Sequence, residues 1–244
     1  LKNRKIKPGA IIRLIQKNKQ WEVVQLPKVE ASLVSMDPQT GAITALVGGF
    51  DFNRNKYNHV TQAKRQPGST FKPFIYSAAL EKGITPATIV NDAPLHFSAA
   101  ETGSGMDWDP QNYDNDFDGH IRLRNGLAKS KNLVAIRVLK AIGAPYAQDY
   151  ASRFGFDPAN HPAYLSMGLG VGSATLIEMV TAYGVFANGG YLKKPYLIEK
   201  MVDSQGQVID QTNTMFQNEE TPRVIDPRNA FIMTTLLQDV VNKG

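Results

Sequence analysis

The sequence predicts an α+β fold with its strands gathered near the N-terminus and mainly helices after them. Two hairpin patterns, in residues 10–27 and 31–49, come first. Helix patterns with recognisable ends begin at Ser69, and they outnumber the strands. Strands grouped before helices are typical of α+β domains, whereas parallel α/β domains alternate the two.

The two hairpins are predicted from apolar runs that flank short turns. Residues 10–27, AIIRLIQKNKQWEVVQLP, form two β-runs around the polar turn Lys17-Asn18-Lys19. The runs at 31–36 and 42–49 flank DPQTG, a turn rich in Pro and Gly. Because two strands rarely make an independent sheet, we expect further strands of this sheet beyond Gly244.

The helices are predicted from their capping residues and apolar periodicity. Pro73 is tolerated near a helix start because the first N–H groups have no partner inside the helix. The first predicted helix begins at Ser69 and stops at Gly83. Two more lie on the two sides of a break at Ser130 within residues 121–143. The last two begin at the Thr175–Glu178 capping box and at Asp226-Pro227. A hairpin is expected within residues 191–212 and a loop over 91–120.

Composition bounds the class of protein. The chain has 244 residues, with Lys+Arg 27 against Asp+Glu 22, and this mild excess shows no basic face for nucleic acid. It has no cysteine, which excludes disulfides and thiol catalysis. The four histidines show no metal-ligand spacing and are expected at the surface or in loops. The Asp-rich stretch from Asp107 to Asp118 lacks the calcium-binding pattern, so we expect a solvated loop.

The most informative stretch is RQPGSTFKPF, residues 65–74. A turn at Pro67-Gly68 followed by a helix places Ser69 and Lys72 on one helix face. A serine hydroxyl needs a base to become a nucleophile, but only about one lysine in 2,500 is neutral at pH 7 when its pKa is near 10.4. A catalytic lysine therefore needs burial and nearby partners, which other parts of the sequence must supply.

A second pair of residues, Ser130 and Asn132, lies in KSKN at the helix break. A serine and an amide two positions apart in an irregular link can both point into one cleft. The simpler interpretation is that Ser130 only caps the helix that follows. For Ser69 and Lys72 the simpler interpretation is a serine at a helix start and a solvated lysine.

These motifs resemble those of a known family. Ser69-Thr70-Phe71-Lys72 and Ser130-Lys131-Asn132 resemble the first two of three motifs of penicillin-recognising serine acyl-transferases, the group of penicillin-binding proteins and serine β-lactamases. The wider context is similar to the transpeptidase domain of class A, bifunctional penicillin-binding proteins. It is carried by LVSMDPQTGAITALVGGFDF, RQPGSTFKPF, IRLRNGLAKSKN, RFGF and GVGSATLIEMVTAYGVFANGG.

The resemblance implies a transpeptidase fold: a central antiparallel sheet, incomplete here, flanked by helices, with a helical subdomain. Residues 1–29 would be a linker or the end of a small β-rich domain. Residues 30–244 would be the N-terminal part of the transpeptidase domain, which stops before the third motif, Lys-Thr/Ser-Gly. The NKG at residues 242–244 is not that motif.

The resemblance also implies roles for four residues. Ser69 would attack the D-Ala-D-Ala bond of a peptidoglycan stem peptide, and Lys72 would take its proton. Ser130 would pass a proton to the departing D-alanine, while Asn132 would bind the substrate peptide and hold Lys72. No metal or cofactor is implied.

The implied setting is the periplasmic side of the inner membrane, reached through an N-terminal anchor outside this sequence. The implied partners are stem peptides, β-lactam antibiotics and other cell-wall synthesis proteins, and the whole protein would also carry a glycosyltransferase.

Three alternatives remain. A class A β-lactamase is disfavoured because Lys131 replaces its Asp and no later glutamate has Asn four residues on. A D,D-carboxypeptidase would use the same motifs with water as acceptor. The intact motif residues argue against a non-catalytic β-lactam sensor.

Overall fold

The computed structural model describes residues 9–102, 106–212 and 223–244. The chain divides into two compact units, Leu1–Ala31 and Ser32–Gly244, and each is considered by itself. The first unit is the predicted hairpin: β1 (Arg13–Lys17) pairs antiparallel with β2 (Gln20–Val24). Its turn residues Asn18 and Lys19 both have positive φ, 50° and 64°, as a two-residue hairpin turn requires.

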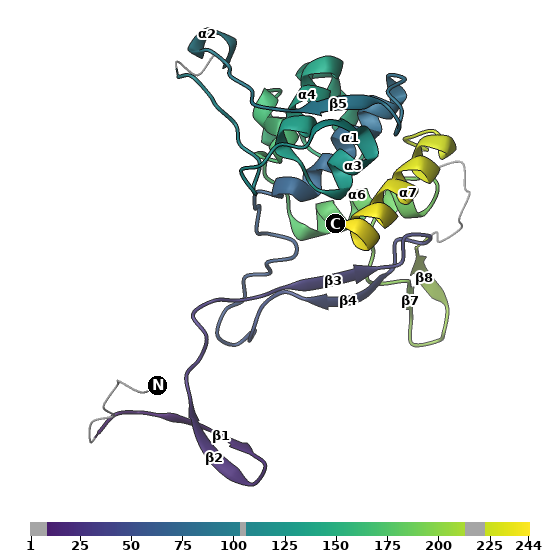
Figure 1. The fold of residues 1–244 in the computed structure, drawn as a ribbon. Coiled ribbons are helices and arrows are strands. Elements are labelled where there is room, and N and C mark those ends of the chain that lie inside the picture. Colours follow the sequence, from purple (N-terminus) through teal and green to yellow (C-terminus); the bar gives the residue numbers. More distant parts are fainter. Residues whose placement is uncertain (1–8, 103–105, 213–222) are drawn as a thin grey trace. The chain divides into compact units, whose positions relative to one another are not determined.

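The second unit contains the remaining strands and the helices (Figure 1). Its strands are β3 (Leu33–Met36), β4 (Ile43–Val47), β5 (Ile89–Asp92), β6 (Gly119–Arg122), β7 (Lys200–Val202) and β8 (Val208–Gln211). Its helices are α1 (Lys72–Glu81), α2 (Ala99–Thr102), α3 (Leu123–Ala128), α4 (Asn132–Ile142), α5 (Ala144–Ser152), α6 (Leu176–Ala187) and α7 (Pro227–Lys243), with the 3-10 turns η1 (Gly68–Phe71), η2 (Pro158–Asn160) and η3 (Leu165–Leu169).

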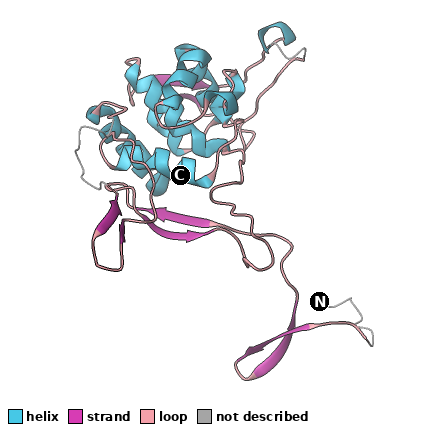
Figure 2. Cartoon of the chain, turned by 180° about the vertical axis from the view of Figure 1, so that it is seen from behind, coloured by secondary structure: helices cyan, strands magenta, loops and turns pink. Residues whose placement is uncertain are grey.

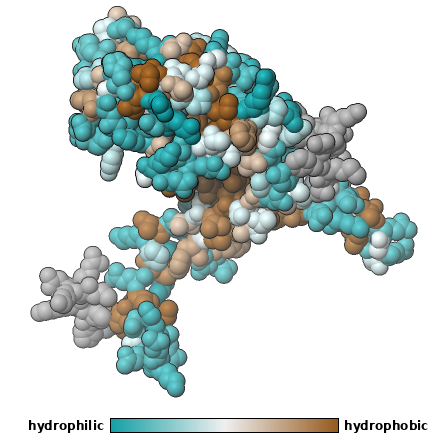
Figure 3. All heavy atoms as spheres, turned by 45° about the vertical axis from the view of Figure 1, so that its right-hand side comes forward, coloured by the Kyte–Doolittle hydropathy of each residue, from teal (hydrophilic) through white to brown (hydrophobic). Residues whose placement is uncertain are grey.

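Within the described residues the strands pair two by two, each pair antiparallel. Among the described residues no sheet is larger than two strands, and the β3–β4 hairpin contacts α6 through β3. Leu33 and Val47, which pair across this hairpin, are each about half exposed. Figure 2 colours these strands magenta and the helices cyan, and Figure 3 shows hydrophobic residues in brown among hydrophilic ones in teal on the face in view.

The core is built around α1. Every residue from Lys72 to Ala79 is buried, because α1 packs against α3, α4, α5 and α7. Phe74 lies at the centre and contacts the rings of Phe154, Phe156 and Phe186. This aromatic packing fixes the helix that carries Lys72, and burial of each large ring contributes about 1.5–3 kcal/mol.

Several sequence predictions about the helices are confirmed. Thr175 and Glu178 form the capping box of α6, Asp226 caps α7, and Pro73 falls at the first turn of α1. The sequence did not predict α5, because Gly143 ends α4 and also precedes the first turn of α5, which contains Pro145. Asn242 and Lys243 are the last two residues of the helix α7. Across the described parts of the chain, no helix has the length and apolar character needed to cross a bilayer.

Candidate active site

Ser69 lies in η1, a 3-10 turn that leads directly into α1. It is exposed, whereas the next motif residues Phe71 and Lys72 are fully buried. The Phe71 ring stacks on His161 with centroids 4.8 Å apart, and Tyr183 donates a hydrogen bond to the Thr70 carbonyl at 2.7 Å. The turn therefore presents a hydroxyl to solvent while its neighbours anchor it to the core.

The glycine-rich stretch at residues 168–173 supports the same turn. Gly68 donates a backbone hydrogen bond to the Gly170 carbonyl at 3.2 Å. Gly170 has φ +68°, and a Cβ there would collide with the Gly68 carbonyl oxygen. These glycines allow close backbone packing, and the packing bears directly on the residue before Ser69.

Lys72 reaches the break between α3 and α4. Its Nζ donates to the Ser130 carbonyl at 2.6 Å, lies 3.1 Å from Ser130 Oγ and donates to Asn132 Oδ1 at 2.8 Å. Nothing local imposes this, because Ser130 follows Lys72 by 58 positions. All three partners are uncharged oxygens, and burial lowers the pKa of Lys72 from 10.5 to about 8.

The interpretation of Ser130 as a helix cap is wrong. The N-cap of α4 is Lys131, and neither its side chain nor that of Ser130 bonds to the first N–H groups of the helix, which donate to Asn112 instead. Ser130 has φ 53°, the left-handed region that residues other than glycine rarely adopt. Its backbone is turned so that both its carbonyl and its hydroxyl face the Lys72 amine. A strained backbone of this kind is common at functional sites.

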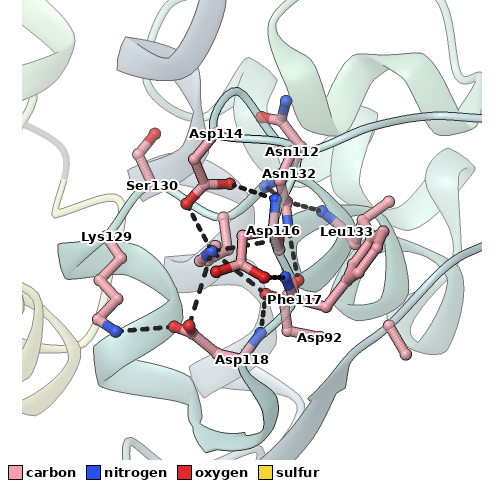
Figure 4. A network of polar contacts seen from close by, with 12 residues as sticks. Asp92, Asn112, Asp114, Asp116, Phe117, Asp118, Lys129, Ser130, Asn132 and Leu133 are labelled. Atoms are coloured by element: carbon pink, nitrogen blue, oxygen red, sulfur yellow. Dashed lines mark hydrogen bonds and ion pairs between the residues drawn. The ribbon is translucent and has the colours of Figure 1, made fainter.

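Lys131, the middle residue of the second motif, is also buried, with 4% of its side chain exposed. Its Nζ lies 2.8 Å from Asp114, 3.6 Å from Asp92 and 3.8 Å from Asp118, three aspartates that are labelled in Figure 4. Burial by itself would lower the pKa of Lys131, but these three carboxylates together raise it. The Asp-rich stretch is therefore not a simple solvated loop as expected, because it closes over a buried cation.

Asn112 is a site residue that the sequence did not reveal. It is 3% exposed, and its Oδ1 accepts the backbone N–H groups of Asn132 and Leu133 at 2.9 and 3.2 Å. The neighbouring Gln111 carbonyl accepts from Asn132 Nδ2 at 2.8 Å. Only the tertiary fold distinguishes Asn112 from the other polar residues of its loop.

The histidines were expected at the surface or in loops, and His161 meets the second expectation but not the first. It lies in a loop but is 2% exposed, between the rings of Phe71 and Phe156. Burial lowers its pKa, which favours the neutral ring. In this environment it acts as part of the packing around η1.

The structure thus brings Lys72, Ser130 and Asn132 into one hydrogen-bonded cluster, with Ser69 one turn before Lys72. A buried amine with a lowered pKa can exchange protons with neighbouring hydroxyls near neutral pH. The arrangement is suited to acyl transfer through a serine. The individual catalytic roles of the four residues stay predictions.

Comparison with known proteins identifies the group. A family model described as the penicillin binding protein transpeptidase domain matches residues 31–244. Penicillin-binding protein 1A of Neisseria lactamica is 49% identical over 240 residues, 98% of this chain and 30% of that protein. The corresponding protein of Pseudomonas aeruginosa is 40% identical over 266 residues, 91% of this chain and 32% of that protein. The chain thus spans about a third of the length of these relatives.

Solved structures agree. The crystal structure of penicillin-binding protein 1A from Haemophilus influenzae matches with a TM-score of 0.88 and 35% identity, over 96% of this chain and 38% of that one. PonA1 from Mycobacterium tuberculosis in complex with penicillin V matches with a TM-score of 0.71 and 26% identity, over 84% of this chain and 54% of that one. The resemblance to class A penicillin-binding proteins and the α+β transpeptidase fold predicted from the motifs are confirmed. The chain belongs to the penicillin-binding protein transpeptidase family.

Proposed function

We propose that this chain carries the acylation centre of a peptidoglycan D,D-transpeptidase, with Ser69 as the nucleophile. The observation that carries the proposal is the placement of Lys72. Its amine is buried against uncharged oxygens, 3.1 Å from Ser130 Oγ, and three positions after an exposed serine. A lysine whose pKa is lowered toward neutral pH, in contact with the Ser130 hydroxyl and three positions after Ser69, is suited to serine acyl transfer.

In the first half of the reaction, neutral Lys72 accepts the proton of the Ser69 hydroxyl. Ser69 Oγ bonds to the carbonyl carbon between the two D-alanines of a stem peptide. The C–N bond then breaks, and the departing D-alanine nitrogen takes a proton through Ser130. The product is an ester on Ser69, and Lys72 ends the step ready to exchange a proton again.

In the second half, the amino group of another stem peptide attacks the ester carbonyl. A new amide forms, Ser69 Oγ leaves as the hydroxyl after regaining a proton, and the two peptides are cross-linked. One amide bond is broken and one is made, so the exchange needs no nucleotide or metal in its balance. The Ser69 backbone N–H would form part of the oxyanion hole.

A β-lactam would acylate the same serine and leave slowly. The structure of the Mycobacterium tuberculosis relative with penicillin V supports this choice of ligand class. We further propose that the whole protein adds a glycosyltransferase, a membrane anchor and the third motif, that it works on the periplasmic side of the inner membrane, and that it cooperates with other cell-wall synthesis proteins.

The test is covalent labelling followed by turnover. The full-length protein is incubated with a fluorescent penicillin, and mass spectrometry of its peptides is expected to place the adduct on Ser69. Stem peptides ending in D-Ala-D-Ala are then supplied with an acceptor amine, and free D-alanine and cross-linked product are measured. Cross-linked product supports a transpeptidase, hydrolysed product alone indicates a carboxypeptidase, and an adduct without peptide turnover indicates a sensor.

A further inference from the structure

The link that carries Ser130 and Asn132 is held locally only at its α3 end, where the Ser130 and Lys131 N–H groups donate to the Leu127 and Gly126 carbonyls. The start of α4 has no side-chain cap of its own, and Ser130 has a left-handed backbone. The first free N–H groups of a helix must be satisfied by other partners. Here Asn132 and Leu133 donate theirs to Asn112 Oδ1, which comes from the Asp-rich loop (Figure 4).

The Asn112 side chain is in turn fixed by acceptors on its other side. Its Nδ2 donates to Asp92 Oδ1 at 2.8 Å and to the Asp116 carbonyl at 2.9 Å. Asp92 is fully buried at the end of β5, and its second oxygen accepts the Asp118 N–H at 3.0 Å. With two acceptors at its nitrogen and two donors at its oxygen, the Asn112 amide has one favourable orientation.

The same loop also orients the Asn132 side chain. The Gln111 carbonyl accepts from Asn132 Nδ2, so the opposite atom, Oδ1, faces Lys72 Nζ at 2.8 Å. Residues 111 and 112 therefore fix both the backbone and the amide of Asn132. Asp92 lies 3.6 Å from Lys131 Nζ, which ties the middle residue of the motif to the same support.

We propose that Asn112, held by the buried Asp92, is a positioning residue for the acylation reaction: it sets the Ser130–Asn132 link against Lys72. The inference rests on the proposed function and extends it to residues outside the two recognised motifs. Asn112 acts through Asn132 and Ser130, and it is not assigned a contact with the reacting atoms. A displacement of this link by even an ångström would disturb proton transfer at Lys72.

The chain contains a matched control for this proposal. Asn188, at the end of α6, is also buried and also makes four hydrogen bonds through its side chain. Its Nδ2 donates to the Pro38 and Tyr191 carbonyls, and its Oδ1 accepts from Gly190 and Tyr191 N–H groups. Asn188→Ala therefore removes as many side-chain bonds as Asn112→Ala without touching the cluster around Lys72.

The experiment measures the rate constant for penicillin labelling of Ser69 in the full-length protein, together with Tm. We expect Asn112→Ala to slow labelling on the order of tenfold to 100-fold. Asn188→Ala should lower Tm comparably but change the labelling rate less than about twofold. Equal labelling rates in the two folded variants would overturn the positioning role.

The pH profile of labelling distinguishes positioning from stability. Because burial is what lowers the pKa of Lys72, loosening the Ser130–Asn132 link and admitting water should move the midpoint of the profile to higher pH. The midpoint of Asn188→Ala should stay at the wild-type value. An unchanged midpoint in Asn112→Ala would overturn the inferred route through Lys72.

A second variant covers the case in which Asn112→Ala does not fold. Asp92→Asn keeps the volume of the side chain but gives Asn112 Nδ2 and Asp118 N–H only one acceptor to share. Slower labelling and a raised midpoint are expected again, and wild-type values would overturn the proposal. A wild-type protein that forms no Ser69 adduct would instead overturn the proposed function itself, together with the role that depends on it.

Discussion

Two lysine side chains are buried on the two sides of the Ser130–Asn132 link, and their surroundings differ. Lys72 is fully buried and donates to a carbonyl, a hydroxyl and an amide oxygen. Lys131 is almost as buried, yet three carboxylates surround its amine. The pKa of Lys72 falls to about 8, whereas that of Lys131 rises.

The difference teaches that burial alone does not decide the charge of a lysine. Desolvation lowers the pKa of both side chains, but only the carboxylates around Lys131 offset it. Neutral oxygens hold the Lys72 amine in place without strongly favouring its proton. One lysine is thereby suited to proton transfer and the other to a permanent ion pair, although Lys131 is the direct sequence neighbour of both residues that contact Lys72.

The proposed role of Lys72 as a base requires that Ser69 is the nucleophile, and this can be tested directly. Ser69→Ala should abolish covalent labelling by a fluorescent penicillin, because no other group at the site is proposed to form the ester. The circular dichroism spectrum and Tm should stay close to wild type, since Ser69 is exposed. Labelling that survives at the wild-type level in this variant would contradict the assignment.

Arginine substitution at each lysine tests the two roles directly. Lys72→Arg should lower the labelling rate constant by about 100- to 10,000-fold, as expected for loss of a general base, because arginine keeps its proton at neutral pH. Lys131→Arg keeps a cation among the carboxylates and should lower the rate by less than about tenfold.

The same stopped-flow or gel-based labelling assay serves both arginine variants. Near-normal acylation by Lys72→Arg would show that only its positive charge matters. A complete loss in Lys131→Arg, with the fold retained, would show that the two lysines are not separable in function.

The pH dependence of labelling should report Lys72. Below its pKa of about 8 the neutral fraction of a lysine rises about tenfold per pH unit. The labelling rate should therefore climb between pH 6 and 8 and level off above it. Lys131→Arg should leave this midpoint in place, because the raised pKa of Lys131 lies outside the range. A flat profile would contradict a base role for Lys72.

The four motif residues of this site could be predicted from the sequence, whereas the residues that hold them in place could not. Ser69, Lys72, Ser130 and Asn132 lie in local motifs, and local turn and capping rules predicted the helices that carry them. Asp92 and Asn112 lie in a stretch without helical or strand periodicity, so nothing in the chain order shows that they meet α4. Their role depends on the pairing of β5 with β6 and on a loop folding back over a buried cation.

Replacing Lys72 or Lys131 with methionine should change the stability of the fold by different amounts, because the two side chains have different surroundings. Because the pKa of Lys72 is 10.5 in the unfolded chain and about 8 in the fold, stability should rise with pH between these values. Keeping Lys72 protonated at pH 7 costs about 3 kcal/mol. Lys72→Met removes that cost, although it also removes three hydrogen bonds.

Lys131→Met instead leaves Asp114 and the buried Asp92 without their cation, while Asp118 keeps its ion pair with Lys129. Breaking a buried ion pair in this way costs about 3–5 kcal/mol. In urea denaturation at pH 7, the free energy of unfolding should therefore be lower for Lys131→Met than for Lys72→Met by at least about 2 kcal/mol. Equal stabilities would mean that the carboxylates find other partners.

The smallest expected effect concerns the exposed side of the Lys131 cluster. Asp114 is 53% exposed and lies 2.8 Å from Lys131 Nζ, and its hydrogen bond to Lys131 lowers its pKa. A carboxylate whose folded pKa is below its unfolded value stabilises the fold above the unfolded value, and this contribution is lost as pH falls through the folded pKa. Asp114→Asn should therefore lower Tm slightly at pH 7 and not at all once the wild-type carboxyl is protonated. In a Lys131→Met background the same substitution should have a smaller effect at pH 7, because, of the two hydrogen-bond partners of Asp114, Lys131 and the Asp116 N–H, only the Asp116 N–H then remains. A decrease in Tm larger than that of Asp92→Asn would show that the exposed carboxylate, and not the buried one, holds Lys131.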